Sequence, residues 1–292
     1  MATITLIGPG AIGLSVASAL IDAGHDVTFV ARTGFDQLEI TRPDGEVRNY
    51  PAKVVDGQDA PAADWVFLCV KTYQVASAAD ALKAAVGPET RVAVIQNGVE
   101  HAENVVPFVD PATAVVPVVI DLPASRSGPG VASFRNPSLA FVEDTEAGRA
   151  FHDLFAGTFL DVTATPDLVS RMWRKLCINA PGAVLCLTGK PMAVFHETGI
   201  ADIARAILSE CVAVGRAAGA EFEGSVIEDQ MAAFMNARPD GSNSMFDDFK
   251  AGRPMEWDAR NGVIARQGRL YGVPTPVSDL ITPILRAQSS QR

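Results

Sequence analysis

The sequence has few of the residues that build metal or disulfide sites. It contains four cysteines, at positions 69, 177, 186 and 211, and no two of them form a C-x-x-C pair. Its four histidines are scattered, without the spacing of metal ligands. We therefore expect no bound metal, and we interpret the cysteines as reduced, buried thiols of a cytoplasmic protein.

Positive charge and long apolar runs are also scarce. The formal net charge of −10 argues against a nucleic-acid partner, because nucleic-acid surfaces of proteins are usually basic. No run of about 18 residues is continuously apolar, and the N-terminus lacks the pattern of a signal peptide, so no membrane partner is expected. The 292 residues include 48% hydrophobic residues, which favours packed cores in two domains.

The first half of the chain alternates short apolar runs with segments of helical composition. Runs that are apolar on both faces are typical of a parallel sheet covered by helices. We expect two shorter strands, Val131–Phe134 and Leu139–Val142, to extend the edge of this sheet. The main strands are expected at Thr3–Ile7, Asp26–Val30, Trp65–Val70, Arg91–Ile95 and Thr113–Ile120, with helices at Ala11–Ala23 and Gln74–Val86.

From about Asp167 the pattern changes to helices without a convincing strand. The sequence therefore predicts an α/β fold, with a doubly wound, mainly parallel sheet in residues 1–166 and an all-helical domain in residues 167–292. The helices of the second domain are expected at Asp167–Leu187, Ile200–Gly219, Ser225–Asn236 and Met255–Gly272.

A glycine-rich turn directly follows the first expected strand. Gly8, Gly10 and Gly13 form the pattern G-x-G-x-x-G between a strand and a helix. In a dinucleotide-binding Rossmann domain, these glycines allow a tight turn, approach of the backbone to the pyrophosphate, and close packing of helix on strand. The pyrophosphate would lie at the N-terminus of the helix, beside Ala11 and Ile12. The first domain is therefore predicted to be a Rossmann domain.

The end of the second strand indicates which dinucleotide binds. An NAD-binding domain usually has an acidic residue there for the ribose 2′-hydroxyl. Here the chain reads Ala31-Arg32-Thr33, and a guanidinium suits the 2′-phosphate of NADP. The sequence therefore predicts NADP(H) as the cofactor, held in part by Arg32.

Two further turns follow the third and fourth strands, where doubly wound sheets bind their ligands. Lys71 follows the third strand and could neutralise a phosphate of the cofactor. Asn97 follows the fourth strand and could donate a hydrogen bond to the cofactor or to a substrate beside the nicotinamide. We predict both as site residues.

Lys175 and Asn179 lie four residues apart in an expected helix, which places them on one face. Reduction of a ketone requires a proton for the developing alkoxide, and a lysine with a lowered pKa can donate it while an amide orients the oxygens. The same spacing is also typical of a solvated helix face, so these two residues alone leave both interpretations open.

Five separated blocks of the chain resemble the ketopantoate reductase (2-dehydropantoate 2-reductase) family, in the same order and with similar spacing. The resemblance therefore covers essentially the whole chain. The blocks are Gly8–Gly13, Lys71-Thr72, Gln96-Asn97-Gly98, Trp173–Asn179, and Asn243-Ser244-Met245 through Met255-Glu256.

The resemblance implies a Rossmann domain and a helical domain with the active site in the cleft between them. It implies NADPH-dependent reduction of a 2-keto acid, either 2-dehydropantoate to pantoate in pantothenate biosynthesis or a close analogue. Lys175 would be the general acid, and Glu256 the carboxylate that orders the lysine and the substrate hydroxyl. Asn97, Asn179 and Ser244 would hold the keto acid. Asp248 is a weaker candidate, since a charge near a helix start also fits a structural role.

One position departs from the family pattern. The family helix commonly carries another asparagine one turn after the position of Asn179, and Ala183 stands there in this chain. The preceding segment, Ala180-Pro181-Gly182, is poor helix material because proline lacks an N–H and clashes with the preceding turn. We therefore expect a reshaped substrate pocket, and a related 2-keto acid stays open as the substrate.

Two other functions also stay open. A β-hydroxyacid dehydrogenase of the 3-hydroxyisobutyrate type would share the Rossmann domain and the Lys-x-x-x-Asn helix, although the Gln96–Gly98, Ser244 and Glu256 blocks favour the ketopantoate reductase family. A non-catalytic NADP-binding sensor would share the cofactor site alone. A small-molecule 2-keto acid is the expected partner, and the sequence leaves open whether the chain forms a homodimer.

Overall fold

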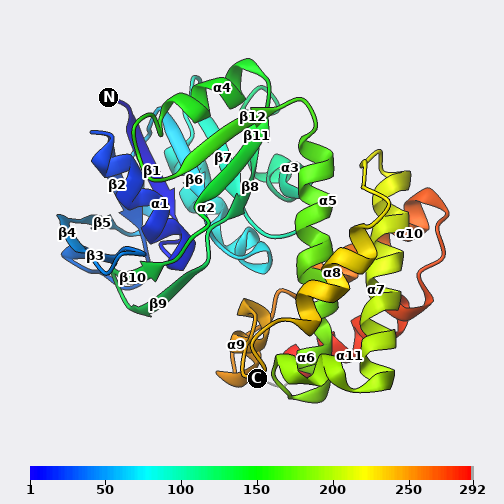
Figure 1. The fold of residues 1–292 in the computed structure, drawn as a ribbon. Coiled ribbons are helices and arrows are strands. Elements are labelled where there is room, and N and C mark those ends of the chain that lie inside the picture. Colours follow the sequence, from blue (N-terminus) through cyan, green and yellow to red (C-terminus); the bar gives the residue numbers. More distant parts are fainter. Residues whose placement is uncertain (291–292) are drawn as a thin grey trace. The chain divides into compact units, whose positions relative to one another are not determined.

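The structure is a computed structural model that describes residues 1–290, and it divides the chain into two compact units (Figure 1). The first unit consists of Met1–Gln96 and Glu100–Leu168, and the second of Asn97–Val99 and the chain from Val169 onward. The sheet elements all precede Val169, and the elements after it are helical, which confirms the predicted fold class.

The first unit is built on an eight-stranded sheet in the order β12-β11-β8-β7-β6-β1-β2-β5. The six neighbouring strands β8, β7, β6, β1, β2 and β5 run parallel to one another. Strand β11 pairs with β8 in antiparallel orientation. All four residues of β6 are buried, as expected for a strand covered on both faces. The strands are β1 (Thr3–Ile7), β2 (Asp26–Val30), β5 (Lys53–Val55), β6 (Trp65–Leu68), β7 (Arg91–Ile95), β8 (Ala114–Asp121), β11 (Leu139–Glu143) and β12 (Asp161–Thr165).

A second, four-stranded sheet has the order β4-β3-β10-β9. The expectation that Val131–Phe134 extends the edge of the main sheet is wrong, because this strand, β10, pairs with β3 and β9 instead. Burial alternates along β3, where Leu38 and Ile40 are buried, so the small sheet covers the core with one face only. Its strands are β3 (Gln37–Thr41), β4 (Val47–Pro51), β9 (Ala124–Gly128) and β10 (Val131–Phe134).

Helix α1 (Ala11–Asp22) contacts strands of both sheets, namely β1 and β2 of the main sheet and β3, β9 and β10 of the small one. Every residue from Gly13 to Leu20 is buried as a result. The hydroxyls of Ser15 and Ser18 within this stretch bond to carbonyls of the helix itself, which satisfies them in the apolar surroundings. The helix that follows the glycine turn is therefore held on two sides.

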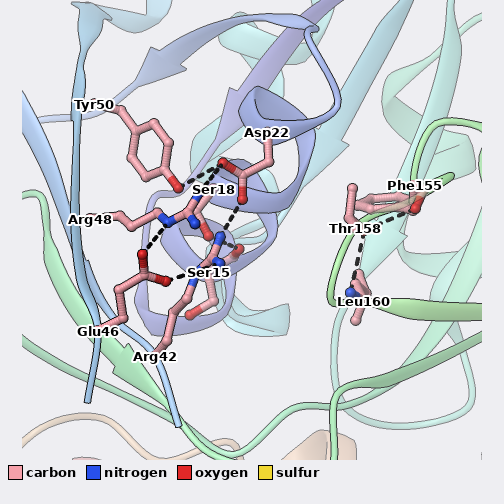
Figure 2. A network of polar contacts seen from close by, with 10 residues as sticks. All are labelled: Ser15, Ser18, Asp22, Arg42, Glu46, Arg48, Tyr50, Phe155, Thr158 and Leu160. Atoms are coloured by element: carbon pink, nitrogen blue, oxygen red, sulfur yellow. Dashed lines mark hydrogen bonds and ion pairs between the residues drawn. The ribbon is translucent and has the colours of Figure 1, made fainter. Parts of the chain in front are cut away.

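A polar network joins the end of α1 to the small sheet (Figure 2). Asp22 accepts hydrogen bonds from Tyr50 at 2.9 Å and from Arg48 at 3.5 Å, and it is ion-paired with Arg42. Glu46 pairs in turn with Arg48 at 3.0 Å. Partial burial raises the pKa of Tyr50, and the hydrogen bond to Asp22 adds to the effect. The network fixes the β3–β4 hairpin against α1.

The remaining helices of the first unit are short: α2 (Ala79–Ala85), α3 (His101–Val105) and α4 (Glu146–Asp153). The helix expected over Gln74–Val86 is divided, since two 3₁₀ turns, Thr72–Gln74 and Ala76–Ala78, precede α2. Among residues 1–290, no helix is both long enough and apolar enough to cross a membrane.

The second unit packs its helices around α7, which contacts α6, α8, α10 and α11. Glu210 on α7 is buried, and its carboxylate accepts hydrogen bonds from the backbone N–H groups of Val277 (2.7 Å) and Ser278 (2.8 Å). These two residues lie at the N-terminus of α11, where negative charge is favourable. The helices are α5 (Leu168–Asn179), α6 (Ala183–Thr188), α7 (Thr198–Ala217), α8 (Val226–Met235), α9 (Ser244–Lys250), α10 (Val263–Tyr271) and α11 (Pro276–Ser290).

Two expected helices of this unit are interrupted. The expectation of one helix over Asp167–Leu187 is wrong, because a 3₁₀ turn at Ala180–Gly182 separates α5 from α6, in line with the effect of Pro181 on a helix. In the segment expected to be helical over Met255–Gly272, a π-helical turn at Asp258–Gly262 precedes α10. Both interruptions lie close in sequence to predicted site residues.

Candidate active site

The glycine turn lies at the carboxyl ends of three parallel strands of the main sheet, which end together. Ile7 pairs with Val30 of β2 and with Leu68 of β6, so the residues after these strands share one edge. Gly8 has a φ of +88°, and a Cβ there would lie 2.5 Å from Cγ1 of Val70. Only glycine fits this position, because of both its backbone conformation and its close neighbour.

The start of α1 is suited to bind an anion. Gly10 precedes the helix, no side chain caps the helix, and its first turn contains no acidic residue. A Cβ added at Gly10 would meet only the carbonyl oxygen of Gly8, at 4.0 Å, whereas one at Gly13 would lie 3.2 Å from Leu6 and Cys69 side chains. Gly10 thus faces open space and Gly13 a packed interior, as a dinucleotide pyrophosphate at this turn requires. Ala11 and Ile12 are both half-buried at the same helix start.

Cations are found at the same edge. Arg32 is exposed just after β2, and Lys71 is half-buried two residues after Cys69, at the end of β6. Arg126, on β9, donates to the carbonyl of Pro9 within the glycine turn at 3.5 Å. Arg126 was not predicted as a site residue, because its strand was not expected. Cations after β2 and β6, and one that contacts the glycine turn, favour a phosphate-bearing ligand here.

The turn after β7 is held by buried polar groups. The amide of Gln96 donates to the carbonyl of Val70 at 2.8 Å, which joins this turn to the one after β6. His101 lies with Nε2 2.9 Å from the carbonyl oxygen of Gln96, and burial lowers the pKa of His101 to about 4. The imidazole is therefore neutral near neutral pH, which makes it a structural group and not a source of charge.

The next residue, Asn97, belongs to the second unit and takes part in a hydrogen-bonded chain of side chains. Its amide donates to Oε2 of Glu256 at 3.0 Å, and its Oδ1 accepts from the amide of Asn179 at 3.4 Å. Glu256 is only 7% exposed. Gly98 allows this approach, because a Cβ there would lie 3.0 Å from the carbonyl oxygen of Ala259. Three residues predicted from separate blocks are thus brought together.

Lys175 lies on α5, four residues before Asn179, and is half-buried. The helix therefore presents the lysine on the same face as the amide that bonds to Asn97. A cation, two amides and a buried carboxylate are the groups that ketone reduction requires for proton donation and for orientation of the substrate oxygens.

Ser244 is the exposed first residue of α9, and its hydroxyl accepts a hydrogen bond from Nη2 of Arg260 at 2.7 Å. The preceding Asn243 caps the helix by accepting from the backbone N–H of Phe246 at 2.9 Å, and donates to the carbonyl of Gly182 at 3.2 Å. No sequence pattern pointed to Arg260, because its flanking residues, Asp258-Ala259 and Asn261-Gly262, form no apolar run that would indicate burial.

Asp248, the weaker candidate, lies within α9 and not at its start. It is 5% exposed, and its carboxylate accepts a hydrogen bond from Nε of Arg253 at 2.9 Å. This pairing supports a structural role.

Among residues 1–290, no group of three or more His, Cys, Asp or Glu side chains is placed to hold a metal ion. The four cysteines are free thiols, of which Cys69 is half-buried and the others are buried.

A Rossmann unit with an anion-binding glycine turn, followed by a helical unit with lysine, amides and a carboxylate, defines a nicotinamide-dependent oxidoreductase of the two-domain type. The profile described as "Ketopantoate reductase PanE/ApbA" matches residues 4–145, and its C-terminal counterpart matches residues 167–289. The chain belongs to the ketopantoate reductase family, as the sequence blocks predicted.

Individual relatives agree with this membership over the full chain. The 2-dehydropantoate 2-reductase of Caulobacter vibrioides is 40% identical over 290 residues, which cover 98% of this chain and 99% of that protein. The 2-dehydropantoate 2-reductase of Mycobacterium tuberculosis is 36% identical over 292 residues, or 99% of each chain. The crystal structure of a PanE/ApbA family ketopantoate reductase from Ralstonia eutropha is 26% identical, covers 99% of both chains and has a TM-score of 0.90.

Proposed function

We propose that the protein is an NADPH-dependent 2-dehydropantoate 2-reductase, which reduces the 2-keto acid to pantoate. Residues 167–292, together with Asn97, would supply the groups that bind the substrate and the acid–base groups. Residues 1–166 would hold the cofactor, through Gly8, Gly10, Ala11, Ile12, Gly13, Arg32 and Lys71. The single observation that carries the proposal is the hydrogen-bonded chain from Asn179 through Asn97 to Glu256, in a member of this family.

The nicotinamide, when bound, supplies the hydride for the carbonyl carbon. Negative charge then collects on the carbonyl oxygen, and Lys175 would donate the proton that converts this oxygen to a hydroxyl. Glu256 would order the lysine and the new hydroxyl, and its own position is fixed by the bond from Asn97. Asn179 would orient the keto acid from the lysine's helix face, while Ser244 would donate to its carboxylate. Proton and hydride together balance the reduction of ketone to alcohol.

Loss of NADPH absorbance with a panel of 2-keto acids tests this proposal. We expect turnover with 2-dehydropantoate and a higher kcat/KM for it than for unbranched 2-keto acids such as 2-oxobutanoate. Turnover of another member of the panel alone would replace the substrate but keep the reaction class. NADPH binding without turnover of any member would instead favour the non-catalytic sensor.

A further inference from the structure

Arg260 is the least exposed charged side chain among residues 1–290, at 2%. Its Nη2 donates to Ser244, whereas Nε and Nη1 are buried and have no hydrogen-bond partner in the described part of the chain. A guanidinium buried with unused donors costs free energy that a complementary anion would offset. The second unit therefore holds a buried guanidinium with two unused donors beside a predicted substrate residue.

The backbone around Arg260 is held in place on both sides. Arg260 lies within the π-helical turn Asp258–Gly262, a rare geometry that is frequent at functional sites. The next residue, Asn261, donates to the carbonyl of Ala180 at 2.9 Å, and the preceding residue, Ala259, lies against Gly98. The backbone that carries Arg260 is thus anchored to the break after α5 and to the turn that carries Asn97.

Neighbouring carboxylates offset the charge of Arg260 without occupying its free donors. Burial lowers the pKa of Arg260, and the negative charges of Glu256 and Asp248 act against this effect. Glu256 accepts from Asn97, and Asp248 accepts from Arg253. The guanidinium therefore stays a cation, because its pKa begins far above neutrality.

The geometry at Ser244 indicates what would complete the site. Ser244 is an exposed residue whose hydroxyl accepts from Arg260, so the hydroxyl keeps its own proton to donate to another acceptor. An ionised acceptor at this hydroxyl would also meet the adjacent guanidinium, and a carboxylate accepts from both kinds of donor. Ala183 is buried and its side chain is apolar, so it offers no donor of its own.

We propose that Arg260, together with Ser244, binds the carboxylate of the 2-keto acid substrate and makes the enzyme specific for the ionised acid over neutral carbonyl compounds. This inference rests on the proposed function for the identity of the acid and for Lys175 as the proton donor. The residue would act on binding and not on proton transfer, because Lys175 supplies the proton.

Specificity for the acid over its ester tests the role of Arg260. The kcat/KM for 2-dehydropantoate and for its methyl ester would be measured with the unchanged protein and with the Arg260→Gln variant. We expect the variant to lose about 10- to 100-fold on the acid, mostly as a rise in KM, and little on the ester. The matched control is Arg266→Gln, because Arg266 lies on α10 and pairs with the exposed Asp258; its acid-to-ester ratio should not change. Equal losses on acid and ester would overturn the inference.

Two further measurements separate the role of Arg260 from misfolding of the variant and from an incorrect choice of substrate. In Arg260→Ala, added guanidinium ion at millimolar concentration should restore part of the activity on the acid, and a folded variant without such rescue would count against the inference. Oxamate, a 2-keto acid analogue that is not reduced, should bind the NADPH complex of the unchanged protein and bind Arg260→Gln at least about 10-fold more weakly. Arg260-dependent oxamate binding without reduction of 2-dehydropantoate would refute the proposed function alone. Equal oxamate binding to both proteins, or none to the unchanged protein, would refute the role of Arg260.

Discussion

The two units present ligand-binding groups in opposite ways. In the first unit, the candidate cofactor site is made of backbone at a glycine turn, with cations such as Arg32 at the surface. In the second unit, the candidate groups Glu256 and Arg260 are buried, and each depends on a partner from another segment. A surface cation beside a backbone-built site can therefore be replaced without disturbing the groups around it, whereas a change in a buried polar cluster affects all of its members.

The largest effect should come from the second unit. Lys175→Ala should lower kcat by about 10²- to 10⁴-fold, because the developing alkoxide loses its proton donor. NADPH affinity should change little, since the glycine turn and Arg32 lie in the first unit. Steady-state kinetics and NADPH titration measure both quantities. Lys190→Ala is the control, as Lys190 is an exposed lysine of the same unit paired with Glu197. A near-normal kcat in Lys175→Ala on the best keto acid would remove the lysine from the mechanism.

A pH effect should come from the interior of the first unit. The pKa of His101 is about 4 in the folded state, against 6.5 for a histidine in an unfolded chain, so the unfolded state binds more protons between these values. The free energy of unfolding should therefore fall as the pH drops below about 6.5, by about 2 kcal/mol at about pH 5 and about 3 kcal/mol at most. Urea unfolding at several pH values would show it. His101→Gln, which cannot titrate, should have a flatter profile, and an unchanged slope would show that other groups dominate.

Cofactor choice should depend on one surface cation of the first unit. Arg32→Ala should weaken NADPH binding by about 10- to 100-fold and leave NADH binding nearly unchanged, because only NADPH carries the 2′-phosphate. Fluorescence titration with both cofactors measures the ratio. Arg91→Ala removes the same charge at the opposite end of the sheet, where Arg91 lies over the ring of Trp65, and it should leave the ratio as it is. Equal weakening of both cofactors in Arg32→Ala would contradict the assignment.

The smallest effect should come from the polar network at the end of α1. Asp22→Asn should lower the free energy of unfolding by less than about 1 kcal/mol, because solvent screens partly exposed ion pairs. The pKa of Tyr50 should fall, since the hydrogen bond to Asp22 contributes to raising it. Thermal unfolding and ultraviolet titration of tyrosine test the two statements. Asp153→Asn, at a largely exposed carboxylate, is the control, and a large loss of activity in Asp22→Asn would mean that the network shapes the cofactor site.

Most of the first unit could be predicted because its signals are local. The strands Thr3–Ile7, Asp26–Val30 and Arg91–Ile95 have the predicted bounds, since each is an apolar run limited by turn residues. The small sheet could not be assigned in this way. Gln37–Thr41 and Val47–Pro51 are largely polar, and Val131–Phe134 pairs with a strand that lies far from it in the sequence.

In the second unit, the sequence indicated helices but not their interruptions or their partners. Helix α9 and helix α11 were not predicted; α11 contains Pro283, which weakens a helical pattern. The family resemblance singled out Lys175, Asn179 and Glu256, whereas Arg260 reads as one more charged residue on a helix. What distinguishes Arg260 is its burial and its bond to Ser244, which depend on tertiary packing alone.

The grouping of Asn97–Val99 with the second unit has a consequence for how the chain can be divided. A gene fragment that begins at Val169 would encode every long helix of that unit, yet it would lack the side chain that bonds to Glu256 and the glycine that lies against Ala259. The helical half is therefore not a self-contained module for domain exchange between relatives. A functional chimera would have to exchange this three-residue turn together with the helices.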